Sequence, residues 1–275
     1  MIIPCRNESK NIIKVLDSLK NQTTKPKYVT IVDDASTDNT FEVITEFIRD
    51  TDWVLIKRKN NNERYSSIVN AMKKATISLQ DDFDYIMVLD GDTVIESKYI
   101  EKIIQKFVAI PMLGIAGGDI CETTNRSNQS IDNDVVFGSN RIYSKKCWLD
   151  INEGKIMKVH SFAWDPEHSI RAKNRGYIVR RFDEVISHSI RIPSMNVPSF
   201  SRGVLRYQFG NSLPRTIISS ILNFDMAFLA GYLDAWINDI QKIDHDKLMK
   251  ELKADSDYKF VKNLIKTFKK YKMVA

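Results

Sequence analysis

Two acidic turns contain the carboxylates that are best suited to bind a metal ion or a nucleotide. Asp90 and Asp92 stand two residues apart, directly after the apolar run 85–89. Divalent cations such as Mg²⁺ and Mn²⁺ take oxygen ligands, typically one or two protein carboxylates together with substrate phosphates. A metal held there would neutralise a diphosphate and stabilise it as a leaving group. An ordinary Asp-Gly turn after a strand has the same sequence, so the spacing alone leaves both interpretations open.

The second acidic turn, Asp33-Asp34-Ala-Ser-Thr-Asp-Asn-Thr40, also closes an apolar run and opens a helical pattern. Ser36 or Thr37 is expected to cap the helix, with Asp38 favourable in its first turn. A capped helix explains these residues but does not explain two adjacent carboxylates before the cap. One of the two could accept hydrogen bonds from a nucleobase N–H or from ribose hydroxyls.

The order of strands and helices predicts where both turns lie. Short apolar, β-rich runs are typical of buried strands and occur at 28–32, 53–56 and 85–89. Helical spacing of apolar residues follows each run, over 38–49, 66–79 and 99–108. This alternation predicts βαβ units and a mostly parallel sheet covered on both sides. Ligands of open α/β sheets bind outside the carboxyl ends of the strands, so both acidic turns should face one cleft.

Composition excludes several classes of protein. The chain has 275 residues, 43% hydrophobic, which suits one large domain or one plus a small appendage. Its ten glycines form neither GxGxxG nor GxxxxGK[ST], so dinucleotide-binding and P-loop signatures are missing. Of the net charge of +6, most lies in residues 241–275, and the nearly neutral remainder argues against nucleic acid as a partner. Three scattered cysteines and no signal-peptide pattern favour the cytoplasm.

The C-terminal part has a different pattern. A catalytic domain is predicted at 1–212 and a helical extension at 213–275. Apolar residues are concentrated in 216–237 and ten lysines follow, a combination that could lie on the cytoplasmic face of an anionic membrane. The alternative is a helical pair that packs on the catalytic domain or on a second subunit in a homo-oligomer. No stretch is long and apolar enough to predict a simple membrane span.

Four segments resemble the signatures of family 2 glycosyltransferases, in the same order. They read Ile3-Pro-Cys-Arg-Asn-Glu8, Val32-Asp-Asp-Ala-Ser-Thr-Asp-Asn-Thr40, Leu89-Asp-Gly-Asp92 and Asp165-Pro-Glu-His-Ser-Ile-Arg-Ala-Lys-Asn-Arg-Gly-Tyr177. The resemblance covers residues 1–190. It implies the GT-A fold, which is an α/β fold with a Rossmann-like, mostly parallel sheet flanked by helices, and it implies nucleotide-activated sugars as donors.

The resemblance also implies a role for each matched position in the donor site. Asp34 would contact the nucleobase, with Pro4 and Glu8 lining the same pocket. Asp90 would approach the ribose or the metal. Asp92 would ligate Mg²⁺ or Mn²⁺ beside the diphosphate.

The last of the four segments, Asp165 to Tyr177, implies a catalytic carboxylate. Asp165 would be the general base that takes the proton of an acceptor hydroxyl during a single displacement with inversion. From the residues alone, Asp165 could instead be the N-cap of a helix that begins at Pro166. Trp164 stands where the family usually has an acid, and its indole could stack on a sugar ring or belong to the core.

Three further residues have candidate roles. The family sometimes places a histidine at the position of His188 as a metal ligand, although a lone histidine at a strand end is more often packed. Arg202 and Arg206 lie four residues apart and could bind the donor diphosphate bidentately if that segment is helical. Solvated arginines are the ordinary alternative.

Together these features predict an inverting, metal-dependent glycosyltransferase that uses a nucleotide-sugar and a hydroxyl of a glycan or lipid-linked acceptor. A base at Asp165 favours a hydroxyl over a polyprenyl phosphate, which is already anionic. The C-terminal region has no convincing Gln-x-x-Arg-Trp, so a processive synthase is not expected. One alternative is a nucleotidyltransferase, whose glycine-rich basic signature is absent. The other is a non-catalytic nucleotide-sugar or glycan-binding protein.

Overall fold

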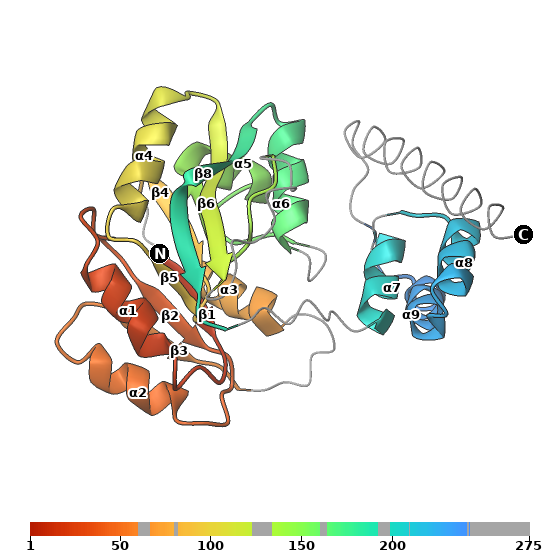
Figure 1. Cartoon of the computed structure of the whole chain (residues 1–275), viewed down its shortest axis with the longest axis horizontal. Coiled ribbons are helices and arrows are strands. Elements are labelled where there is room, and N and C mark those ends of the chain that lie inside the picture. Colours follow the sequence, from red (N-terminus) through yellow and green to blue (C-terminus); the bar gives the residue numbers. More distant parts are fainter. Residues whose placement is uncertain are drawn as a thin grey trace, which may run out of the picture. The chain divides into compact units, whose positions relative to one another are not determined.

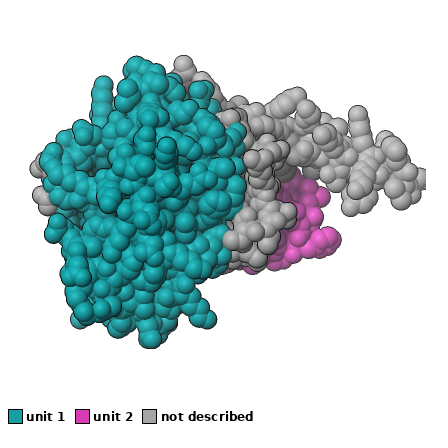
Figure 2. Space-filling view, turned by 60° about the vertical axis from the view of Figure 1, so that its left-hand side comes forward, with its two compact units in different colours: residues 1–197 teal, residues 198–275 magenta. Residues whose placement is uncertain are grey.

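The chain divides into two units, residues 1–197 and 198–275, which Figure 2 shows in different colours. The computed structural model describes residues 1–59, 67–79, 82–122, 134–159, 164–191, 199–208, 210–240 and 242. The boundary expected from the sequence, at 212/213, falls inside the second unit.

The strands of the first unit form one sheet in the order β3-β2-β1-β4-β7-β6-β8-β5 (Figure 1). Their bounds are β1 Ile2–Cys5, β2 Thr30–Asp33, β3 Val54–Lys57, β4 Tyr85–Leu89, β5 Thr93–Ile95, β6 Leu113–Glu122, β7 Asn140–Ser144 and β8 Ile178–Ser189. The pairs among β3, β2, β1 and β4 are parallel, as is β6 with β8. β7 runs antiparallel to β4 and β6, and β5 runs antiparallel to β8. The predicted mostly parallel sheet is confirmed.

Helices cover both faces of this sheet. They are α1 Ile12–Lys20, α2 Thr40–Phe47, α3 Ser67–Ile77, α4 Tyr99–Ala109, α5 Lys145–Asn152 and α6 Trp164–Asn174. Successive strand residues point to opposite faces, so β4 sends Leu89 into a core with α1, α2 and α4 and sends Val88 into a core with α3, α5 and α6. A strand buried on both faces must be apolar throughout, which is why the runs were recognisable.

The strands β1, β2 and β4 end at the same edge, and hydrogen bonds join the loops that follow β1 and β2. The Glu8 N–H donates to Thr40 Oγ1 at 2.8 Å, and the Thr37 N–H donates to Asn7 Oδ1 at 2.8 Å. The expected cap at Ser36 or Thr37 is wrong, because α2 begins only at Thr40. Asp38 Oδ1 accepts from the Thr40 N–H at 3.0 Å, while the Ser36 hydroxyl accepts from the Asn7 N–H.

The second unit consists, in its described part, of α7 Ser199–Gln208, α8 Leu213–Leu222 and α9 Met226–Ile237. Glycines at the crossing of α7 and α9 let the two backbones touch. A Cβ added at Gly203 would lie 1.9 Å from the Phe228 carbonyl oxygen, and one added at Gly231 would lie 1.9 Å from that of Phe200. The helical pattern predicted after residue 213 is observed in α8 and α9, while the rest of the predicted extension, residues 243–275, lies outside the described residues. Among the described helices, none has the length and apolarity needed to cross a bilayer.

Candidate active site

A cavity of about 230 Å³ lies at the carboxyl ends of β1, β2 and β4. Its lining contains every donor-site residue predicted in the first unit, and comprises Pro4, Cys5, Arg6, Glu8, Asp34, Ile68, Asp90, Gly91, Asp92 and Arg191. The two acidic turns therefore face one cleft, as the order of parallel strands predicted.

Gly91 allows the turn after β4 to pack against the end of β1. A Cβ at this position would lie 2.7 Å from Cys5 Cβ and 3.5 Å from Glu8 Cγ, so a larger residue would push the turn away. The close approach places Asp90 and Asp92 beside the loop that carries Glu8. The sequence predicted an Asp-Gly turn here, but it did not predict that the turn packs against Cys5 and Glu8.

Asp34 is buried and forms an ion pair with Arg58, which follows β3 directly. Its backbone N–H donates to the Cys5 carbonyl at 2.9 Å, which fixes the start of the loop. Burial raises the pKa of Asp34, and the adjacent Arg58 guanidinium opposes that rise. Arg58 was missed by the sequence analysis. The feature that could have indicated Arg58 is its place directly after β3, because β3 ends at the same edge of the sheet as the strands that precede the acidic turns.

Asp90 is the most perturbed carboxylate of the site. Burial raises its pKa to about 7, and the negative charges of Asp92, Asp165 and Glu8 act in the same direction. Its buried Oδ1 atom has no hydrogen-bond partner among the residues that the structure describes. A buried carboxylate oxygen without a partner is costly, and a bound cation is one group that could satisfy it.

Arg191 bridges two of the acidic side chains. Its Nη2 lies 2.7 Å from Glu8 Oε1 and 3.0 Å from Asp92 Oδ2. The preceding residue, Ile190, which follows the end of β8, donates its N–H to the Asp92 carbonyl at 2.9 Å. Arg191 was also missed, because it comes 99 residues after Asp92 in the sequence.

The metal site expected from Asp90, Asp92 and His188 stays a prediction. Within the described ranges, no group of three or more His, Cys, Asp or Glu side chains is placed to hold a metal ion. His188 is exposed on β8, whereas its neighbours Ser187 and Ser189 are buried on the other face of the strand. Asp90 and Asp92 do line the same cavity, and Mg²⁺ or Mn²⁺ bound to a substrate diphosphate needs only one or two protein carboxylates.

Asp165 lies in the first turn of α6, which begins at Trp164, so it is not the N-cap considered above. A Cβ placed on Gly138 would lie 2.9 Å from Trp164 Cζ2 and 3.5 Å from the Asp165 Cγ, so the glycine lets its segment pack against the first turn of α6. The Asp165 carbonyl accepts from Arg141 Nη1 at 2.7 Å and from Ser169 Oγ at 2.9 Å. The buried Arg141, on β7, thus anchors the first turn of α6, a role that the sequence did not indicate.

Trp164 belongs to the core. It is buried, its ring centroid lies 6.0 Å from that of His168, and the Arg141 guanidinium lies 5.5 Å from its centroid. Of the two interpretations left open by the sequence, core packing is the one observed.

Arg202 and Arg206 both lie on α7, in the second unit. Arg202 Nη2 forms an ion pair with Asp225 Oδ2 at 2.8 Å, and the Arg206 guanidinium lies 5.9 Å from the Phe228 ring centroid. The expected helical spacing is confirmed. Their contact with a donor diphosphate stays a prediction, because the two units are not placed relative to one another.

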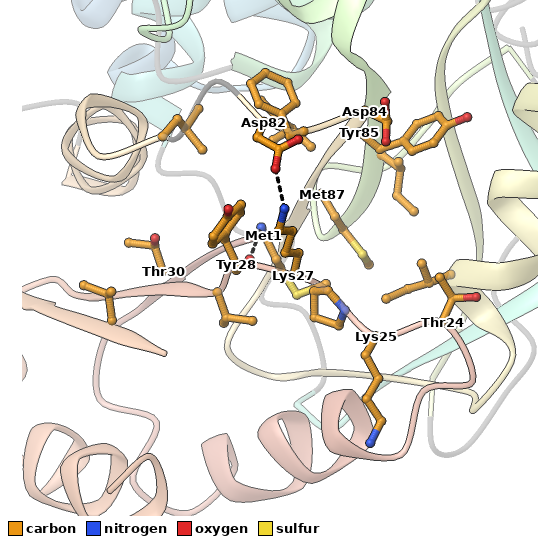
Figure 3. A pocket seen from close by; sticks show the side chains of 18 of the residues that line it. Met1, Thr24, Lys25, Lys27, Tyr28, Thr30, Asp82, Asp84, Tyr85 and Met87 are labelled. Carbon is orange, nitrogen blue, oxygen red and sulfur yellow. Dashed lines mark hydrogen bonds and ion pairs between the residues drawn. The ribbon is translucent and has the colours of Figure 1, made fainter. Parts of the chain in front are cut away.

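A second cavity, of about 440 Å³, lies at the amino ends of β1, β2 and β4 (Figure 3). Lys27 and Asp82 form an ion pair there, and the Met1 amino group donates to the Tyr28 carbonyl at 2.6 Å. None of the predicted catalytic or donor-binding residues lines it. Since ligands of this kind of sheet bind at the carboxyl ends of the strands, the smaller cavity is the candidate donor site.

A mostly parallel sheet with carboxylates gathered at the ends of β1, β2 and β4 is the arrangement expected of the GT-A class of glycosyltransferases. The chain belongs to glycosyl transferase family 2, whose sequence model matches residues 1–164.

The chain is similar to the poly-beta-1,6-N-acetyl-D-glucosamine synthase of Staphylococcus epidermidis, with 30% identity over 118 residues. The match covers 43% of this chain and spans only 27% of the synthase. The fold of this chain is similar to that of S. aureus TarS 1-349 in complex with UDP-GlcNAc. The TM-score is 0.54, and the identity is 16% over 77% of this chain and 66% of the TarS chain. The fold is also similar to that of the mannosyltransferase PcManGT from Pyrobaculum calidifontis in complex with GDP-Man and Mn²⁺, with a TM-score of 0.55 and 16% identity over 94% of this chain and 78% of PcManGT. The GT-A fold is confirmed.

Proposed function

We propose that this protein is an inverting glycosyltransferase that moves a sugar from a nucleotide-sugar to a hydroxyl group of a glycan or lipid-linked acceptor. The observation that carries the proposal is the grouping of carboxylates from separate loops. Asp34, Asp90 and Asp92 line one cavity, and Asp165 is close enough to raise the pKa of Asp90. In this proposal the second unit brings the enzyme to its acceptor, at a membrane surface or within a homo-oligomer.

The donor would lie in the 230 Å³ cavity. Asp34 would accept hydrogen bonds from the nucleobase, and its ion pair with Arg58 would hold the carboxylate in place. Pro4 and Glu8 would form the adjoining wall. Two proteins of similar fold bind UDP-GlcNAc and GDP-Man in their solved complexes, which supports a nucleoside diphosphate sugar as the class of donor.

Asp90 and Asp92 fit a divalent cation, Mg²⁺ or Mn²⁺. The buried Oδ1 of Asp90 has no hydrogen-bond partner among the described residues, and Asp92 presents a second carboxylate to the same cavity. When bound, the cation would offset the negative charge that develops on the diphosphate leaving group.

Asp165 would supply the base that the reaction needs. The acceptor oxygen attacks the anomeric carbon while its proton passes to the Asp165 carboxylate. The bond between that carbon and the diphosphate oxygen breaks, and the oxygen keeps the electron pair, so the configuration inverts. A sugar hydroxyl is a weak nucleophile at neutral pH, which is why a positioned carboxylate is required. A phosphate acceptor would need no such group.

Transfer and hydrolysis assays with UDP-, GDP- and dTDP-sugars and Mn²⁺ test this proposal. Asp165→Asn should lower turnover by roughly 10²–10⁴-fold, the usual contribution of a positioned base, and should leave donor affinity unchanged. Asp92→Ala should abolish metal-dependent nucleotide binding. The product of an α-linked donor should be β-linked by NMR. Donor binding without transfer to any hydroxyl acceptor would instead indicate a non-catalytic binding protein.

A further inference from the structure

The second unit exposes several large apolar side chains. Its buried positions combine apolar residues such as Val204 and Tyr232 with small and polar ones, among them Gly203, Thr216, Ser220 and Gly231. Its exposed positions include the large apolar residues Ile217, Ile218, Ile221, Leu222, Phe224, Met226, Trp236 and Ile237. An exposed apolar surface of this kind marks a site of interaction.

The exposed apolar residues are densest at the turn between α8 and α9. We call Ile221, Leu222, Phe224 and Met226 the apolar tip. Their exposed fractions are 62%, 48%, 95% and 65%. The four residues lie within six consecutive positions at the end of a helical hairpin, so a partner can reach all of them at once.

Phe224 adopts a backbone conformation that its side chain does not favour. Its φ is 50°, in the left-handed region. The Asp225 N–H donates to the Ser220 carbonyl at 2.9 Å and the Phe224 N–H to that of Ile221 at 3.2 Å, which is the Schellman pattern that ends many helices. Glycine is the usual residue at this position, and a bulky one is strained there. The strain brings no burial, since the ring is exposed, and this points to a partner outside the chain.

The turn is nevertheless held firmly. Asp225 Oδ1 accepts from the Phe228 N–H at 3.0 Å at the start of α9, and its other carboxylate oxygen pairs with Arg202 at 2.8 Å. The Ser220 hydroxyl donates to the Asp225 carbonyl at 2.7 Å. The apolar tip is therefore presented on a fixed scaffold, which limits the entropy lost when it binds.

We propose that the apolar tip inserts into the interfacial region of an anionic lipid bilayer. α8 and α9 have 10 and 12 residues, so each is roughly 15–18 Å long against about 30 Å for a hydrocarbon core. A hairpin of this length reaches the interface, where exposed aromatic and aliphatic side chains are stable.

The positive charge of the C-terminal residues favours an anionic bilayer, rather than a second copy of the chain, as the partner of the apolar tip. Residues 241–275 follow the hairpin in sequence and contain ten lysines against five acids. This excess positive charge is attracted to anionic headgroups, whereas two copies of it repel each other. The inference does not rest on the proposed transferase activity, because lipid binding is measured without donor or acceptor.

Sedimentation of the full chain with vesicles tests the inference. We expect binding to phosphatidylcholine vesicles that contain phosphatidylglycerol, weaker binding to phosphatidylcholine alone, and release by added salt. Phe224→Gly should lower the binding constant by about tenfold or more, because it removes a large apolar side chain from the interface. Its thermal midpoint should be equal to or above that of the wild type, since glycine suits the left-handed backbone.

Two further variants complete the experiment. Met226→Gln should weaken vesicle binding in the same direction without altering the backbone at Phe224. Val108→Ser changes a residue that is also exposed, on α4 of the first unit, and should bind vesicles as the wild type does. Wild-type binding by Phe224→Gly would overturn the inference, as would no binding of the wild type to anionic vesicles. A dimer in lipid-free sedimentation that Phe224→Gly dissociates would identify the tip as a subunit contact instead.

Discussion

Arg191 holds the side chain of Asp92 from the opposite end of the site, with its Nη2 and Nε atoms 3.0 and 3.1 Å from Asp92 Oδ2. The same guanidinium lies 2.7 Å from Glu8 Oε1. A positive charge therefore already occupies the place between carboxylates where we propose that a divalent cation and a diphosphate bind. The Arg191 guanidinium and the proposed metal ion would both bind the Asp92 carboxylate, so Arg191 should compete with the metal.

Arg191→Ala should tighten Mn²⁺ binding in the absence of nucleotide. The gain should be only about two- to fivefold, because the arginine side chain is more than half exposed and its ion pairs are screened by water. Titration of free Mn²⁺ by electron paramagnetic resonance measures this directly. Arg180→Ala, which changes an exposed arginine on β8, the strand that precedes Arg191, is the matched control. Weaker Mn²⁺ binding by Arg191→Ala would mean that the arginine assembles the site rather than competing for it.

Asp90 should make the metal-free protein less stable as the pH rises. Its pKa is about 7 in the folded chain and near 3.8 when unfolded, so folding favours the protonated carboxyl. That stability is fully present below about pH 4 and is lost as the pH rises through 7. Asp90→Asn should remove this loss and stabilise the protein at pH 8 by about 2–4 kcal/mol. Denaturant unfolding with a chelator, at pH 5 and pH 8, gives the result. The exposed change Asp50→Asn is its control, and equal pH dependence of Asp90→Asn and wild type would contradict the expectation.

Asp34→Asn should weaken binding of UDP or GDP by about 10- to 100-fold, the usual effect of losing a charged hydrogen bond in a buried site. Thermal shift with each nucleotide ranks the affinities, because bound ligand raises the melting temperature. Arg58→Ala should weaken the same binding, since it removes the ion-pair partner of Asp34. Unchanged affinity in both variants would place the nucleobase elsewhere.

Arg141→Lys should lower kcat more than it changes KM for the donor. The guanidinium of Arg141 donates to the Asp165 carbonyl and to the Ser169 hydroxyl, and lysine cannot reproduce this forked geometry. We expect turnover to fall about tenfold as Asp165 moves within the first turn of α6. Ser169→Ala removes one hydrogen bond to the same carbonyl. It should lower turnover less than Arg141→Lys does and should lower the free energy of unfolding by about 1 kcal/mol. A rise in KM alone would show that Arg141 acts on the donor site instead.

The local pattern of the sequence determined the parallel half of the fold and the carboxylates of the cavity. Strands that are buried on both faces must be continuously apolar, so the runs ending at Asp33 and Leu89 were recognisable without any tertiary information. Neighbouring parallel strands also end at one edge of the sheet, and this predicted that the two acidic turns lie close together.

The arginines beside those carboxylates, and the exposure of His188, depend on long-range contacts that the sequence pattern does not reveal. Arg58, Arg141 and Arg191 meet their partners across 24 to 99 positions of sequence, and no local period encodes a contact of that range. His188 shares a strand with two buried serines but lies on its opposite, exposed face. One residue of register decides between these faces, and register depends on the pairing of β8 with β5 and β6.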